Sequence, residues 1–216
     1  MAGQPHPDPA LPRLLDAVRR IGKLTAGRVA TGRTHQDADD LLGTIDTDDA
    51  IGFDPVPLLH RLHRSGGKIV VIGQVAGIMH GSAELTGDLD LLWDGAAAQA
   101  TALATAFAAV DARLRDDDGR PLPCDAAAFR LPKVIFDSPA ASGDCCTPSL
   151  PWGDLPIADF IARCAVATSG DGFAVDYLRR DDLIRMRRAA GRPKDLRRAE
   201  ELERLPRIGQ RPRECR

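Results

Sequence analysis

The chain has 216 residues, of which 44% are hydrophobic and 28% charged, with a formal net charge of -2. This is ordinary for a soluble globular protein with one substantial core, and no apolar run approaches the roughly 20 residues that a membrane-spanning helix needs. Five cysteines without disulfide-like or metal-like spacing favour reduced thiols. We therefore expect a cytoplasmic protein with no membrane segment.

Residues 1–54 are predicted to be an N-terminal extension that is partly flexible. Residues 1–12 are polar, contain four prolines and lack the apolar core of a secretory signal, so regular structure is not expected there. Residues 14–24 have the apolar spacing of a short helix.

The segment 25–54 is rich in Gly, Thr and Asp and is expected to be mostly loop, with one helical turn predicted at residues 37–42. Its acids Asp46, Asp48 and Asp49 lack the glycine and terminal glutamate of a calcium loop. A solvated turn is therefore favoured over a metal site.

A strand, a tight turn and a helix are predicted at the centre of the chain. Residues 55–64 form a short helix that opens with proline, and the β-branched run 68–72 forms the strand that follows. Gly73 marks the turn, and residues 74–80 carry small and apolar side chains at helical spacing. The first backbone N–H groups of such a helix can bind a phosphate.

Two carboxylates, Asp88 and Asp90, fall at the start of the next apolar run, residues 89–93. On a strand this spacing places both carboxylates on one face while Leu89 and Leu91 point into a core. The carboxylates would repel each other, and a divalent cation such as Mg²⁺ would remove that cost. The sequence thus predicts a metal and phosphate site.

The alanine-rich segment 95–115 is predicted to be a helix that packs on the sheet. Residues 129–137 and 143–147 are predicted to be two strands of a hairpin. Asp144 on the second strand is the favoured third carboxylate of the site, and Asp137 on the first is its competitor.

The last quarter of the chain is predicted to end in a basic tail, residues 206–216. Asp181 or Asp182 is expected to cap a helix, and roughly half of all Lys and Arg residues lie beyond Tyr177. Such a run suits a polyanionic partner or a triphosphate, although a solvated helix face is the simpler explanation. The elements expected before the tail are a helix, a strand and two helices at residues 156–167, 173–177, 182–190 and 194–205.

Four short patterns occur in a fixed order: Gly73-Gln74, Thr86-Gly87-Asp88-Leu89-Asp90, Gly143-Asp144, and the string DLIRMRRAAGRPKDLRRAEEL from Asp182. Together they resemble the nucleotidyltransferase-fold superfamily. The similarity is greatest to the bacterial branch of minimal nucleotidyltransferases and toxins of type IV toxin-antitoxin systems. It covers residues 55–205, the predicted domain.

The resemblance implies an α/β fold with a small mixed sheet flanked by helices. It also implies that Asp88, Asp90 and Asp144 are catalytic and hold two Mg²⁺ (or Mn²⁺) ions. Arg192 and Lys194 would bind the β- and γ-phosphates. The activity implied is transfer of NMP from an NTP to a hydroxyl of RNA (such as a tRNA end), of a protein or of a small molecule.

Gly73, Gln74 and Thr86 would complete the substrate side of the site, but Gln74 departs from the Gly or Ser usual in the family. Its amide would either donate to a phosphate or crowd the place where the backbone should approach one. The alternative function is therefore a catalytically degenerate binding protein of a toxin-antitoxin or defence pair, with a cognate antitoxin as partner. A glycosyltransferase also uses Asp-x-Asp, but residues 1–66 offer no strands for a nucleotide-binding half.

Overall fold

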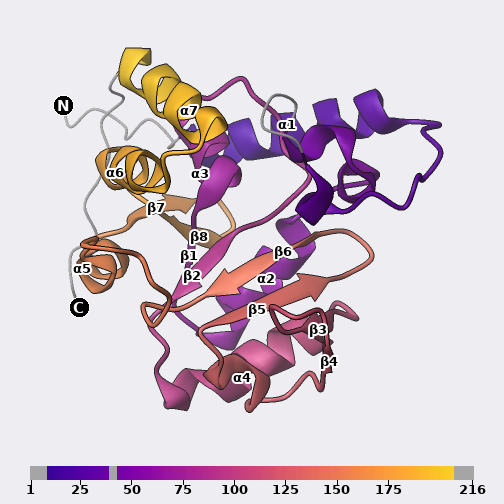
Figure 1. Ribbon diagram of the computed structural model, residues 1–216, viewed down its shortest axis with the longest axis vertical. Helices are drawn as coiled ribbons and strands as arrows, with labels where there is room; N and C mark the ends of the chain where they lie inside the picture. The colour runs from indigo at the N-terminus through magenta and orange to yellow at the C-terminus, as the bar shows by residue number, and fades with distance from the viewer. Residues whose placement is uncertain (1–8, 39–42, 207–216) are drawn as a thin grey trace.

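A mixed β-sheet with helices on both faces forms the core of the computed structural model, which describes residues 9–38 and 43–206 (Figure 1). The predicted α/β class is confirmed. The strands are β1 Ile69–Val71, β2 Leu91–Trp93, β3 Arg113–Arg115, β4 Pro121–Leu122, β5 Lys133–Asp137, β6 Ser142–Cys146, β7 Ala165–Thr168 and β8 Ala174–Tyr177. Within the described residues they form one eight-stranded sheet in the order β4-β3-β5-β6-β2-β1-β8-β7, which is larger than expected.

The helices fall into two groups, one on each side of the sheet (Figure 1). On one side α1 packs against α3, and α6 packs against α7 and α3; on the other, α2 packs against α4. Their bounds are α1 Ala10–Thr25, α2 Val56–Ser65, α3 Gly73–His80, α4 Ala97–Ala108, α5 Ile157–Ala162, α6 Arg180–Ala190 and α7 Pro193–Arg204. Short 3-10 helices lie at His35–Asp37, Thr44–Asp46, Asp48–Ala50 and Ala128–Arg130.

The strand directions bring three segments of the chain together near one end of β1 and β2. β1 is antiparallel to β2, so the end of β1 lies beside the start of β2. β2 is parallel to β6, with Leu91 opposite Cys145, so the residues just before each of these also lie side by side. The Gly73 turn, Asp90 and Asp144 consequently meet at this end.

The core is continuous from the N-terminal helix to the C-terminal one. Leu14 and Ile21 of α1 belong to the same buried cluster as Leu202 of α7. Under the other face, the rings of Phe129 and Phe136 pack on Phe107 of α4, at centroid distances of 5.2 and 5.0 Å. Such ring pairs add about 0.5–1.5 kcal/mol each to the effect of burial.

The helix predicted over residues 95–115 is wrong in its second half, where α4 ends at Ala108 and the chain enters β3. Asp111 adopts a left-handed backbone conformation (φ 55°), and the turn there redirects the chain. Leu114, which fits a helical stripe, is buried by pairing with Phe136 of β5. The short strand β4 was not predicted either.

A second error has the same origin: the helix predicted over residues 156–167 stops at Ala162, and β7 follows. Two alanines favoured a helix locally, but β7 pairs antiparallel with β8, with Ala167 opposite Val175. Conversely, α1 begins at Ala10, although no regular structure was expected before residue 13. Pro12 falls in the first turn, where the backbone N–H has no helical partner to lose.

Smaller differences concern element ends. Arg179 is the N-cap of α6, so Asp181 and Asp182 lie in its first turn instead of capping it. Of the helical turn predicted at residues 37–42, only the start is described, as the end of a 3-10 helix, while 39–42 lie outside the described residues. The basic tail lies outside them from residue 207 onward.

The central helix-strand-helix unit, the hairpin of β5 and β6, the strand β8 and the last two helices are confirmed within a few residues of their predicted ends. None of the helices in the described ranges combines the length and apolarity needed to cross a bilayer. In the same ranges the cysteines are free thiols: Cys124, Cys145, Cys146 and Cys164.

Arg180 is a buried arginine that holds the end of the last helix. Its guanidinium donates to the carbonyl oxygens of Leu202, Leu205 (2.5 Å) and Pro206 (3.1 Å). These carbonyls lie at the C-terminal end of α7, where helical partners are missing and a cation is favoured.

We predict that Arg180→Met lowers the free energy of unfolding by about 1.5–3 kcal/mol, because it removes charged hydrogen bonds and leaves the buried Leu202 carbonyl without this donor. Arg188→Met on the same helix removes only an exposed pair with Glu203 and should cost less than about 1 kcal/mol. Urea unfolding of both variants measures the difference. Equal losses would contradict the role assigned to Arg180.

Candidate functional site

A cleft of about 580 Å³ opens where the Gly73 turn, the residues before β2 and the middle of β6 meet. It is bounded by the Gly73 turn, the residues before β2, strand β6, the junction of α6 and α7, and the loop before α2. Seven of the eight site residues predicted from the sequence line it: Gly73, Gln74, Asp88, Asp90, Asp144, Arg192 and Lys194. The eighth, Thr86, is completely buried behind it.

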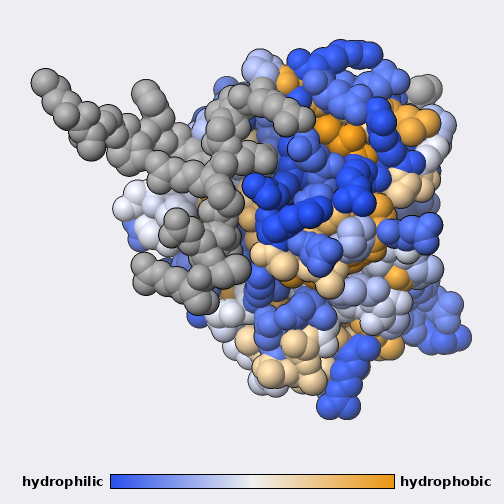
Figure 2. Space-filling model, turned by 90° about the vertical axis from the view of Figure 1, so that its left-hand side faces the viewer, coloured by the Kyte–Doolittle hydropathy of each residue, from blue (hydrophilic) through white to orange (hydrophobic). Residues whose placement is uncertain are grey.

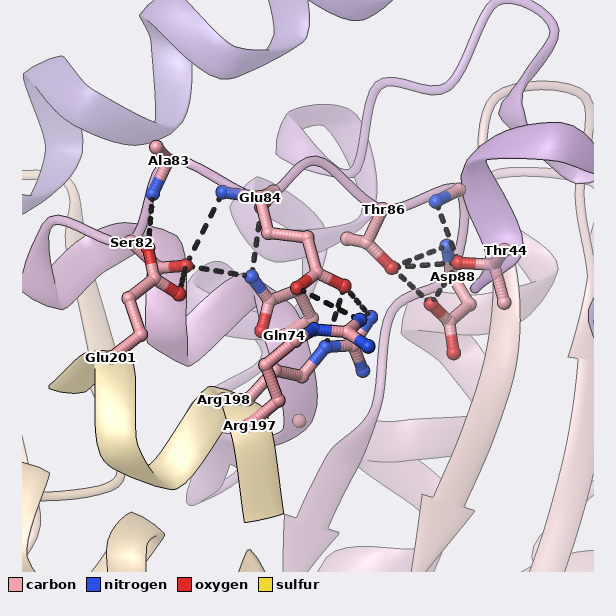
Figure 3. A network of polar contacts seen from close by, with 12 residues as sticks. Thr44, Gln74, Ser82, Ala83, Glu84, Thr86, Asp88, Arg197, Arg198 and Glu201 are labelled. Carbon is pink, nitrogen blue, oxygen red and sulfur yellow. Dashed lines mark hydrogen bonds and ion pairs between the residues drawn. The ribbon is translucent and has the colours of Figure 1, made fainter. Parts of the chain in front are cut away.

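Two threonines fix the carboxylate of Asp88 (Figure 3). Thr44 Oγ1 donates to Asp88 Oδ1 at 2.7 Å, and Thr86 Oγ1 donates to the same oxygen. Thr44 Oγ1 in turn accepts the Gly87 backbone N–H at 2.9 Å. Thr86 therefore orients Asp88 from the protein side and does not face the cleft.

Asp90 is held by its backbone and by the glycine opposite. Its carbonyl accepts the Ile72 N–H at 2.9 Å, which places its carboxylate against the Gly73 turn. Gly73 has φ +61°, and a Cβ at this position would overlap the Asp90 carboxylate. Burial raises the pKa of Asp90 well above its ordinary value, and the negative charges of Asp88 and Asp144 add to the shift.

Asp144 comes from the middle of β6, opposite Ile135 of β5. Lys133 Nζ lies 3.7 Å from its Oδ2, and His35 Nε2 lies 3.9 Å from its Oδ1. Burial raises the pKa of Asp144; the charges of Lys133 and His35 lower it, and the net shift is upward. Asp137, the alternative third carboxylate, pairs with Ser142 at the closed end of the hairpin and is not among the described residues that line the cleft.

The Gln74 side chain is buried and fully occupied by partners inside the protein (Figure 3). Its Nε2 donates to Ser82 Oγ at 2.9 Å and to the Glu84 carbonyl at 2.8 Å, and its Oε1 accepts from Arg187 at 2.7 Å. The side chain therefore neither offers its amide to a phosphate nor projects across the cleft. It ties the turn to the segment that leads to β2.

Buried arginines support this turn from behind. Arg187 also donates to the Gly73 carbonyl at 3.1 Å, and burial together with the charge of Arg198 lowers its pKa to about 10. Arg198 pairs with Glu84 at 2.6 Å. Arg187 and Arg198 both line the cleft. Arg198 is neutralised by Glu84, whereas Arg187 donates to the carbonyl oxygens of Gly73 and Arg198 and to the Gln74 amide oxygen.

Arg192 and Lys194 lie at the mouth of the cleft, at the junction of α6 and α7. Arg192 Nε contacts Asp195 Oδ2 at 2.5 Å, and its side chain is 60% exposed. On the face that carries α5, α6 and α7, hydrophilic residues gather in the upper part, with hydrophobic patches between them (Figure 2). Several arginines of the run beyond Tyr177 are paired, as Arg188 with Glu203, Arg192 with Asp195 and Arg204 with Glu200, so the run serves structure as well as surface charge.

The sequence did not single out His35, Lys133, Arg187 or Trp152, all of which line the cleft. Lys133 carried a usable signal, because it opens the strand that pairs with the one bearing Asp144. His35 carried none, since it stands in a loop whose position depends on distant contacts. Of the three acids expected in a solvated turn, Asp48 accepts backbone N–H groups of Thr31 and Gly32, whereas Asp49 bonds His35 within the site.

The donor chemistry of the cleft fits a hard divalent cation. As they stand, no three His, Cys, Asp or Glu side chains in the described part of the chain converge closely enough to form a ready ligand cage. Asp144 Oδ1 is nevertheless buried without a hydrogen-bond partner, and two of the three carboxylates have raised pKa values. A cation among these oxygens would satisfy the orphaned atom and offset the repulsion.

No protein-family model matches the chain, and no curated protein matches it.

The raised pKa of Asp90 has a consequence for stability. A carboxyl whose folded pKa exceeds its unfolded value near 3.8 keeps its proton longer in the folded state, so folding stability falls as pH rises above that value. We predict that, in EDTA, Asp90→Asn raises the melting temperature at pH 7, by roughly 2–4 °C per kcal/mol relieved. The gain should shrink as the pH falls toward 4, because the unfolded carboxyl, whose pKa is near 3.8, then begins to take up its proton as well.

Calorimetry between pH 4 and pH 8 checks this, with Asp137→Asn outside the cleft as the control. A lower melting temperature for Asp90→Asn at pH 7 would show that the carboxylate is not under repulsion.

A further prediction concerns Gln74→Ser. The serine cannot reach the partners of the glutamine amide, so a buried Arg187 donor and the Glu84 carbonyl each lose a hydrogen bond. The free energy of unfolding should fall by about 1–3 kcal/mol. Gln36→Ser, an exposed glutamine of the same cleft, should change it by less than about 0.5 kcal/mol in the same urea titration. A neutral Gln74→Ser would contradict the structural role.

Proposed function

We propose that the cleft transfers a nucleoside monophosphate from an NTP to a hydroxyl acceptor with the help of a divalent cation. The observation that carries this proposal is the meeting of Asp88, Asp90 and Asp144 in one cleft, beside a glycine turn that opens a helix. Chemistry at a phosphate needs both groups, since the carboxylates can hold a cation and the turn lets backbone approach the anion. The resemblance of the sequence motifs to nucleotidyltransferases supports the same function.

Each side chain has a part that follows from its position. Asp88, Asp90 and Asp144 would hold the cation, and Arg192 and Lys194 at the mouth would bind the outer phosphates. When bound, the cation would stabilise charge on the phosphoryl oxygens and lower the pKa of the acceptor hydroxyl. The chain itself keeps these groups in place before the substrate arrives, which reduces reorganisation during the reaction.

The wall of the cleft away from the carboxylates is suited to contact a nucleoside. Trp152, Leu150 and Met186 give it an apolar side, and the Trp152 Nε1 donates to the Thr147 carbonyl at 2.8 Å, which fixes the ring. Stacking of a base on an aromatic ring contributes about 1–3 kcal/mol and tolerates any base. A volume of about 580 Å³ lies within the range of pockets that bind small molecules and cofactors.

The second candidate is a catalytically inactive relative that binds a partner such as a cognate antitoxin. The observation that favours it is the occupied amide of Gln74, because the hydroxyl that the related pattern often places there has no counterpart in this cleft. The two candidates differ in one testable property: only the first predicts transfer of a labelled nucleoside monophosphate from an NTP to an acceptor.

We expect the protein to transfer label from at least one α-³²P-NTP, with Mg²⁺ or Mn²⁺, to an acceptor in total RNA or cell lysate. Asp88→Asn, Asp90→Asn and Asp144→Asn should each reduce the rate at least about 100-fold, since each removes charge from the cation site but preserves shape. Asp137→Asn, on the same hairpin but outside the cleft, should keep the wild-type rate.

Full activity in Asp88→Asn or Asp90→Asn would reject the proposed site. No transfer by the wild type with any NTP and either cation would favour the inactive relative. Circular dichroism of each variant controls for folding.

A further inference from the structure

His35 points into the cleft with an unused nitrogen. It opens the 3-10 helix His35–Asp37, in the loop that covers one side of the carboxylates. Its side chain is only 10% exposed, and its Nε2 is buried without a hydrogen-bond partner among the described residues. Leaving such an atom unpaired costs about 1–3 kcal/mol.

Asp49 fixes the ring from the other side. The Nδ1 of His35 lies 3.1 Å from Asp49 Oδ2, and the His35 backbone N–H donates to the same carboxylate oxygen. An ionised carboxylate can only accept, so Nδ1 carries the hydrogen and the lone pair of the neutral ring is on Nε2. A carboxylate behind a histidine is the usual support of a metal-binding imidazole.

The unused nitrogen faces an unused oxygen. Nε2 lies 3.9 Å from Asp144 Oδ1, and both atoms are buried without hydrogen bonds. Two acceptors cannot satisfy each other, whereas one cation between them satisfies both. Nitrogen and oxygen ligands at about 2.0–2.2 Å from an ion lie about 3 Å apart, so a movement of about 1 Å would complete the contact.

The local charge also favours a cation here. The carboxylates of Asp49 and Asp144 lie 3.1 Å and 3.9 Å from the two ring nitrogens of His35. The negative charge on these two sides stabilises a cation at this place.

We infer that His35 is a nitrogen ligand of the divalent cation beside Asp144, and that the site consequently prefers Mn²⁺ to Mg²⁺. This inference rests on the proposed function, which requires a cation among the carboxylates. Mg²⁺ takes oxygen ligands almost throughout, whereas imidazole nitrogen suits transition metals. The preference is thus set by one side chain outside the carboxylate set.

The test is pulsed electron paramagnetic resonance of the whole protein loaded with Mn²⁺. We expect electron spin echo modulation from a directly bound ¹⁴N nucleus in the wild type. His35→Gln should abolish this modulation and lower Mn²⁺ affinity at least about tenfold. It should change Mg²⁺ affinity, measured by competition, much less. His60→Gln is the matched control, because His60 stacks on Phe173 away from the cleft and should leave both readouts unchanged.

Labelling the wild type with ¹⁵N-histidine gives the same answer without a variant. The ¹⁴N frequencies should be replaced by those of ¹⁵N, and His35 is the histidine that lines the cleft in the described part of the chain.

The outcomes separate the two claims. Mn²⁺ that binds in an Asp88-dependent way but shows no histidine nitrogen overturns the assignment of His35 and leaves the proposed function standing. Absence of Mn²⁺ binding in the wild type, even with an NTP present, overturns both. Modulation that persists in His35→Gln also rejects the assignment.

Discussion

Mutual repulsion among Asp88, Asp90 and Asp144 is the constraint on which the rest of the structure depends. Carboxylates free to move would turn away from one another toward water, so their meeting in a half-buried cleft has to be imposed by the backbone. The imposition is visible in the sheet: β1 runs antiparallel to β2 and β6 runs parallel to it. Asp88, Asp90 and Asp144 therefore lie close together and line the same cleft.

Close backbone contacts at two glycines hold the carboxylates in this arrangement. Gly73 leaves room for the Asp90 carboxylate, and at Gly143 a Cβ would overlap the Leu89 carbonyl oxygen. The repulsion is partly offset by cations held in the wall, because Arg187 binds the carbonyl of the Gly73 turn and Lys133 approaches Asp144. A fold that keeps unfavourable charges together in a cleft is typical of a functional site.

Local sequence patterns were sufficient to predict the positions of Asp88 and Asp90 and of the Gly73 turn. Alternation around Leu89 and Leu91 and the glycine after a β-branched run depend only on neighbours in the chain, and both leucines are buried as predicted. The wrong predictions of helix lie where pairing with a strand distant in sequence determines the secondary structure. Leu114 suits a helix until Phe136 of β5 is placed beside it, and β7 exists only because β8 pairs with it.

The side chains of the site show the same division. The direction of the Gln74 amide depends on Ser82, Glu84 and Arg187, the last of which lies 113 residues away in sequence, so no local pattern could give it. His35 lies in a loop and reaches the cleft because its ring contacts Asp49, and no sequence periodicity reveals such a contact.

The central claim, that the three carboxylates hold a cation against a nucleotide, is tested most directly by a crystal structure with Mn²⁺ and a non-hydrolysable NTP analogue. The account predicts an anomalous manganese peak between Asp88, Asp90 and Asp144 with the phosphates beside the Gly73 turn, whereas a nucleotide bound elsewhere, or a cleft without manganese, would contradict it.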